Sequence, residues 1–96
     1  MRLFFIVCEA SVDERVIDLL ERLGAPGFTR WTGAVGDGRH GRREGTPVWP
    51  GLNSVIMACL PDEQHQPLLA AIDALRAERS GRLAIRVFSV PAEDHG

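Results

Sequence analysis

Short apolar runs and segments of helical periodicity alternate along this chain. The first run, Leu3–Cys8, is bounded by charged residues and has the length of a buried strand. The next segment, Ser11–Leu23, has apolar residues at helical spacing and ends at Gly24 and Pro26. It opens with Ser-Val-Asp-Glu, a capping-box pattern in which Glu14 reaches back to the helix start. The pattern predicts a strand followed by a capped helix.

Three further strands and a second helix follow. Phe28–Val35 is rich in β-forming residues, and Asn53–Leu60 is a second apolar run. A helix is predicted from Pro61 to Ser80, since its apolar positions 68, 69, 72 and 75 recur with helical spacing. Leu83–Val90 then alternates in the manner of a strand. The predicted order is β-α-β, a long loop, and β-α-β.

This order predicts one α+β domain, spanning residues 1–96, with a ferredoxin-like βαββαβ sandwich and a functional loop at about 33–52. Both helices would then cover the same face of the sheet. Leu3–Val7 and Val55–Leu60 are nevertheless apolar at every position, which a solvated second face would not tolerate. We therefore expect a homo-oligomer formed through the second face of the sheet.

Composition and charge narrow the possible functions. The chain has 96 residues and a formal net charge of −2 at pH 7, which gives no general attraction to nucleic acid or to anionic membranes. All eleven basic residues are arginine, so a Walker A loop and a Schiff-base lysine are excluded. No apolar run approaches the roughly 18 residues that span a bilayer. We expect a cytoplasmic protein that binds no nucleic acid.

The long loop is the part of the sequence that most suggests binding. Residues 33–51 hold six of the ten glycines, and Gly36–Gly41 matches the G-x-G-x-x-G pattern of dinucleotide sites. Two prolines follow, so no helix can begin there to hold a pyrophosphate, and a Rossmann site is excluded. Glycine-rich backbone beside arginines can still bind an anion, and a freely solvated loop is the alternative.

The basic cluster of the loop and the lack of a catalytic spacing limit the possible chemistry. Arg39, His40, Arg42 and Arg43 form a cluster that is too narrow for nucleic acid. The sequence also contains no spacing typical of a nucleophile with its base, so we expect no enzyme.

The two cysteines leave two interpretations open. Cys8 and Cys59 each lie near the C-terminal end of a predicted strand, and we expect these strands to be parallel neighbours with their thiols close together. The thiols are then either two small buried apolar groups or ligands of a soft metal. No Cys-x-x-Cys pattern supports the metal site.

The whole arrangement resembles the P-II signalling superfamily. The resemblance rests on the first strand Leu-Phe-Phe-Ile-Val-Cys, the helix after it, and the run Asn53-Ser-Val-Ile-Met-Ala-Cys-Leu-Pro-Asp-Glu-Gln. The loop from Gly33 to Gly51 is similar to the short loop of small P-II-like proteins, some of which are associated with ion-transport systems. The modifiable tyrosine of the nitrogen-sensing members is missing, which excludes its uridylylation.

The resemblance implies a homotrimeric regulatory protein that binds an adenine nucleotide (ATP, ADP or AMP) between subunits. The nucleotide would be an effector, and no certain cofactor is implied. The implied nucleotide-binding residues are Gly33, Gly36, Gly38, Arg82 and Arg86. The implied loop residues that contact a protein partner, a membrane transporter being one candidate, are Arg39, His40, Arg42, Arg43 and Trp49.

A second hypothesis is a metal-responsive trimer similar to the divalent-cation-tolerance proteins. Its ligands would come from His40, Cys8 or Cys59.

Overall fold

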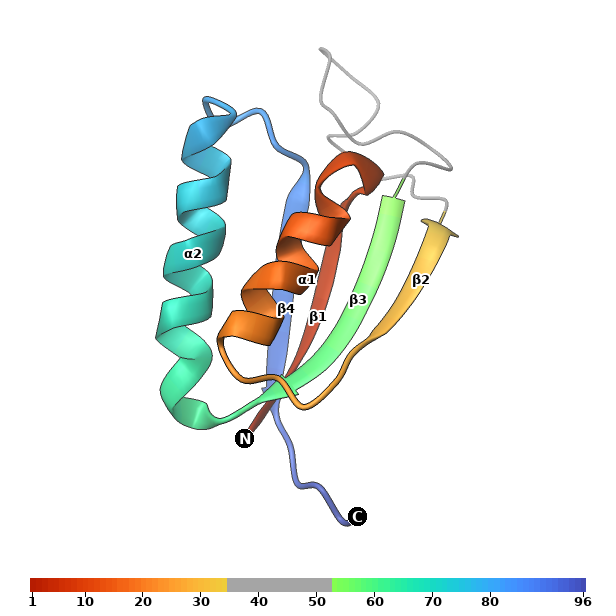
Figure 1. Cartoon of the computed structure of the whole chain (residues 1–96), viewed down its shortest axis with the longest axis vertical. Helices are drawn as coiled ribbons and strands as arrows, with labels where there is room; N and C mark the ends of the chain where they lie inside the picture. Colours follow the sequence, from red (N-terminus) through yellow and green to blue (C-terminus); the bar gives the residue numbers. More distant parts are fainter. Residues whose placement is uncertain (35–52) are drawn as a thin grey trace.

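A single four-stranded sheet carries both helices on one of its faces (Figure 1). The computed structural model describes residues 1–34 and 53–96. In chain order the elements are β1 (Arg2–Glu9), a 3₁₀ turn (Ala10–Val12), α1 (Asp13–Arg22), β2 (Thr29–Ala34), β3 (Asn53–Leu60), a second 3₁₀ turn (Asp62–Gln64), α2 (His65–Glu78) and β4 (Ile85–Pro91). The bounds of β3 are those predicted from its apolar run, and the other strands differ from their predictions by only one or two residues.

The strand order is β2-β3-β1-β4, and every neighbouring pair is antiparallel. β3 therefore lies between β1 and β2, while β1 lies between β3 and β4, so each βαβ unit encloses a strand of the other. This is the ferredoxin-like arrangement, which confirms the predicted fold class. The expected parallel pairing of the first and third strands is wrong. β3 runs antiparallel to β2, and the α1 crossover makes β2 parallel to β1.

The core lies between the sheet and the two helices. Alternate residues of β1 and β3 point to this side, and α1 and α2 contribute one buried stripe each. Burying a large apolar side chain contributes about 1.5–3 kcal/mol, so this layer supplies most of the stabilisation. Its fully buried large apolar side chains are Phe4, Ile6, Val12, Val16, Leu20, Ile56, Leu60, Leu68 and Ile72.

The second face of the sheet, here called the open face, is largely apolar, and neither of the two helices in the described residues covers it. Strand pairing aligns Trp31, Val55 and Val7 in one row across the sheet, and Met57, Phe5 and Phe88 in the next. Three of the exposed aromatic side chains lie in these rows, with relative exposures of 49% for Trp31, 36% for Phe5 and 53% for Phe88. Further open-face positions of β1, β3 and β4 are Leu3, Cys59, Arg86 and Val90. The expectation that both faces are apolar is confirmed.

Both helices end where the sequence signals predict, whereas the start of the first helix does not follow its signal. After α1 the chain turns at Gly24, with a φ of 90°. The connection after α2 turns at Ser80 and Gly81, with φ of 55° and 76°, as the Ser-Gly pair predicts. The capping box predicted at the start of the first helix does not form. The residue before α1 is Val12, with no side-chain cap, and the Glu14 carboxylate instead accepts a hydrogen bond from Arg30 at 2.6 Å.

Candidate functional site

One end of the sheet gathers the segments that the sequence singled out for binding. Here β1 and β2 end, β3 and β4 begin, α1 starts and α2 finishes (Figure 1). The register places Cys8 beside Ser54 and Ile85, and Ala34 beside Asn53. We call this end of the molecule the loop edge, because β2 and β3 flank residues 35–52 there.

The end of β2 contains the one predicted glycine that lies within the described residues. Gly33 has φ +68°, and the pairing of β2 with β3 shifts register between Trp31 and Ala34. No atom lies within 4 Å of the position that a Cβ would take, so the backbone conformation, and not space, favours glycine. Beyond the shift, the Asn53 side-chain amide donates to the Ala34 carbonyl at 3.4 Å and joins the two strands again.

A group of linked polar side chains, buried at Ser54 and exposed at Glu14, lies below these strand ends. The Ser54 hydroxyl, fully buried, donates to the Asp13 carboxylate at 2.7 Å. The Arg30 guanidinium lies 3.7 Å from the same carboxylate and 2.6 Å from Glu14. Sequence reasoning missed this group because its members come from α1, β2 and β3. The only signal was the acidic pair Asp13 and Glu14, and the capping-box pattern assigned Glu14 to the helix start instead.

The two predicted phosphate-binding arginines lie at the opposite side of the sheet from Gly33. Arg82 is exposed in the turn between α2 and β4. Arg86 lies on the open face, with its guanidinium carbon 5.6 Å from the centre of the Phe88 ring. Since β1 and β3 separate β4 from β2, three strand spacings, about 14 Å, lie between the two edge strands. One chain therefore does not bring these arginines to Gly33.

The other predicted site residues lie outside the described part of the chain. They are Gly36 and Gly38 of the implied nucleotide site, and Arg39, His40, Arg42, Arg43 and Trp49 of the implied partner-binding loop.

The interpretation that the two thiols lie together is wrong. Cys8 pairs with Ser54, whereas Cys59 pairs with Leu3 at the other end of β1, five residues or about 17 Å away. Cys8 also faces the core, and Cys59 the open face. Within residues 1–34 and 53–96, no three His, Cys, Asp or Glu side chains are grouped as metal ligands would be. Burial, reinforced by the charges of Asp13 and Glu9, raises the pKa of the Cys8 thiol to about 12.

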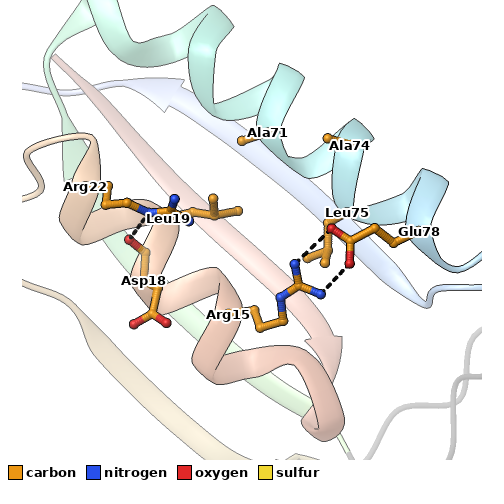
Figure 2. A pocket seen from close by; sticks show the side chains of 8 residues that line it. All are labelled: Arg15, Asp18, Leu19, Arg22, Ala71, Ala74, Leu75 and Glu78. Atoms are coloured by element: carbon orange, nitrogen blue, oxygen red, sulfur yellow. Dashed lines mark hydrogen bonds and ion pairs between the residues drawn. The ribbon is translucent and has the colours of Figure 1, made fainter.

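A groove lies between the two helices. Arg15 of α1 closes one end with two hydrogen bonds to Glu78 of α2, at 2.6 and 2.9 Å (Figure 2). Leu19 and Leu75 line its interior, together with two alanines of α2. Arg22 donates to the carbonyl of Asp18 at its other end. None of the predicted site residues lines this groove.

The comparisons with known proteins agree with the fold. The family model described as nitrogen regulatory protein P-II matches residues 1–95, and the chain belongs to that family. It is thus a P-II-like regulatory protein, and the resemblance inferred from the sequence is confirmed. A search of the curated proteins finds no match. Among the described residues, no helix has the length and apolar character needed to cross a membrane.

Several solved structures are similar to this chain over most of its length. CPII from Thiomonas intermedia K12, bound to ADP and bicarbonate, is 27% identical with a TM-score of 0.67, and the match covers 93% of this chain and 84% of that one. A second CPII structure, bound to ADP, AMP and bicarbonate, is 26% identical with the same coverage and TM-score. A protein from Thermus thermophilus, described as a PII-like signalling protein, is 26% identical with a TM-score of 0.64, covering 93% and 82% of the two chains.

The raised pKa of Cys8 predicts a stability change at alkaline pH. An unfolded chain ionises this thiol above pH 9, whereas the folded chain keeps it neutral up to about pH 12. The folded state therefore binds more protons in that interval, and its stability falls as pH rises. Urea titrations between pH 9 and 11 should show a loss of roughly 1 kcal/mol per pH unit that Cys8→Ala largely removes. Cys59→Ala is the control and should keep the slope; equal slopes in wild type and Cys8→Ala would refute the assignment.

Proposed function

We propose that this protein binds an adenine nucleotide between the subunits of a homotrimer and uses it to control contact with a protein partner. The observation that carries the proposal is that one chain holds the residues of the candidate site at opposite sides of the sheet. Gly33 lies at the β2 edge and Arg82 beside the β4 edge, at the same end of the sheet. A site that includes both requires the β2 side of one copy to meet the β4 side of another.

The open face supports assembly of this kind. Its two rows of apolar side chains leave Trp31, Phe5 and Phe88 between one third and about one half exposed in a single chain. An apolar surface that continues across four strands favours a partner surface over water. Packing copies face inward would bury these rows and bring neighbouring sheet edges together. Three copies is the number implied by the resemblance to the P-II superfamily.

The charges at the divided site suit a phosphorylated ligand. Neither Arg82 nor Arg86 forms an ion pair with any other described residue, so both guanidinium groups retain their capacity for an anion. The glycine-rich segment after Gly33 adds backbone N–H groups, which bind phosphate oxygens well. The binding of ADP and AMP by the similar CPII structures supports an adenine nucleotide as the ligand.

We propose regulation without catalysis as the role of this binding. Residues 33–52 then contact a protein partner through Arg39, His40, Arg42, Arg43 and Trp49, with a membrane transporter as one candidate, and the protein acts in the cytoplasm. An order change in such a segment, set by a bound nucleotide, is a common way for a regulatory protein to signal.

Nucleotide binding should be visible as thermal stabilisation. At about 100 times its dissociation constant, ADP, AMP or ATP should stabilise the protein by about 2.7 kcal/mol, which raises Tm by several degrees in a domain of this size. Arg82→Ala should weaken the affinity about tenfold, since it removes a charged contact to phosphate. Arg22→Ala is the matched control, because Arg22 is exposed on α1 and lies away from the loop edge. Stabilisation by zinc or copper alone would favour the metal-responsive alternative.

The proposed trimer predicts a large effect from one charge on the open face. Light scattering after size exclusion should give the wild type three times the chain mass of 10.5 kDa. Phe88→Asp should give monomers, because assembly would bury the new carboxylate without a partner. Ala70→Asp, on an exposed position of α2, should leave the trimer intact. A monomeric wild type, or a trimeric Phe88→Asp variant, would contradict assembly through this face.

A further inference from the structure

We propose that Asp13 is a positioning residue that holds the start of β3 and, through Arg30, the first half of β2, and through these two strands the loop side of the nucleotide site. This inference rests on the proposed function for its effect on ligand binding. Asp13 touches no implied ligand-binding residue among those described, so its removal should weaken nucleotide affinity by loosening the strand ends.

The contacts of Asp13 join α1 to β3 at the loop edge and to β2 nearer the start of that strand. Its carboxylate, with the side chain only 13% exposed, lies in the first turn of α1. It accepts the Ser54 hydroxyl at 2.7 Å and faces the Arg30 guanidinium at 3.7 Å. Ser54 is the second residue of β3, and Arg30 the second of β2. The strand that enters residues 35–52 and the strand that leaves them are therefore both held to α1.

The pairing of β2 with β3 is regular at Arg30, the residue this support reaches, and is interrupted further along the strand. The register shift between Trp31 and Ala34 interrupts the ladder just before residues 35–52. The hydrogen bond from the Asn53 side-chain amide to the Ala34 carbonyl is long, at 3.4 Å. β2 is also an edge strand with only one neighbour in the described sheet. The position of this end of β2 therefore depends on the regular part of the strand, where the Arg30 guanidinium is held from the helix side by Glu14 at 2.6 Å and by Asp13 at 3.7 Å.

The segment that carries Asp13 is itself anchored on the other side of the sheet. Glu9, four residues earlier, faces Arg79 at the end of α2 at 3.5 Å, and its backbone N–H donates to the Ala84 carbonyl at 3.1 Å. These two contacts enclose the turn that contains Arg82. Residues 9–13 therefore connect the arginine side of the proposed site to its glycine side within one chain.

A first-turn aspartate is favourable in any helix because it complements the helix dipole. That role needs no contact with the strands and would be fulfilled by an exposed side chain. Asp13 instead turns inward, where a desolvated carboxylate is costly unless it is well partnered. The contacts of Asp13 with the two strands therefore explain the orientation of its side chain better than the helix dipole does.

The test compares local exchange with ligand affinity in matched variants. Hydrogen exchange measured by mass spectrometry should become at least tenfold faster in Asp13→Ala for peptides covering residues 29–34 and 53–57, and stay unchanged for β1. ADP affinity, from calorimetric titration, should fall at least tenfold. Asp13→Asn retains an oxygen that accepts the Ser54 hydroxyl and should restore most of the exchange protection.

Arg15→Ala is the matched control, since it removes the ion pair to Glu78 from the same helix without touching β2 or β3. It should leave both exchange at the strand ends and ADP affinity at wild-type values. Unchanged exchange in Asp13→Ala, or an equal rise in every strand, would overturn the positioning role. If wild type itself binds no nucleotide, the proposed function fails, and the exchange comparison still decides whether Asp13 holds the strand ends.

Discussion

The antiparallel register between β1 and β3 determines most of what this molecule can do. It runs without a break from Arg2 opposite Leu60 to Glu9 opposite Asn53. Because successive side chains point to opposite faces, a slip of one residue would turn Phe4, Ile6 and Ile56 out of the core. The same register places the end of β1 beside the start of β3, so the start of α1 lies next to the strand that leaves residues 35–52. The core, the open face and the loop edge are three consequences of one pairing.

The open face connects folding to the proposed function. A small sheet with helices on one side leaves its other side apolar, and this chain places Phe5, Phe88 and Trp31 there. In the same geometry Gly33 and Arg82 stand beside opposite sheet edges, which no internal rearrangement short of unfolding would bring together. In the proposed assembly, covering the face and completing the proposed site would be the same event. A nucleotide that binds both edges would also stabilise the assembly by mass action.

The sequence predicted the elements of the fold well and their long-range relations less well. Apolar runs and helical spacing are local signals, so β3 and the turn at Ser80 were found where the structure has them. The relative direction of β1 and β3 follows from the predicted βαββαβ order, because the α1 crossover makes β2 parallel to β1 and β3 then runs back along β2. The expected closeness of Cys8 and Cys59 failed because it assumed parallel strands. Of the predicted site residues, Gly33, Arg82 and Arg86 lie in the described part of the chain, and the two arginines lie at the opposite side of the sheet from Gly33.

The Asp13 group shows why a local motif can be read in two ways. Ser-Val-Asp-Glu matches a capping box, in which Glu14 serves its own helix. Arg30, sixteen residues later, offers that carboxylate a charged donor at 2.6 Å, and a charge-assisted bond is stronger than one to a neutral backbone N–H. Asp13, its neighbour, is turned toward Ser54, forty-one residues away. The acidic pair thus serves the sheet, and the first turn of α1 becomes the point at which the two strands beside residues 35–52 are fixed to the body of the protein.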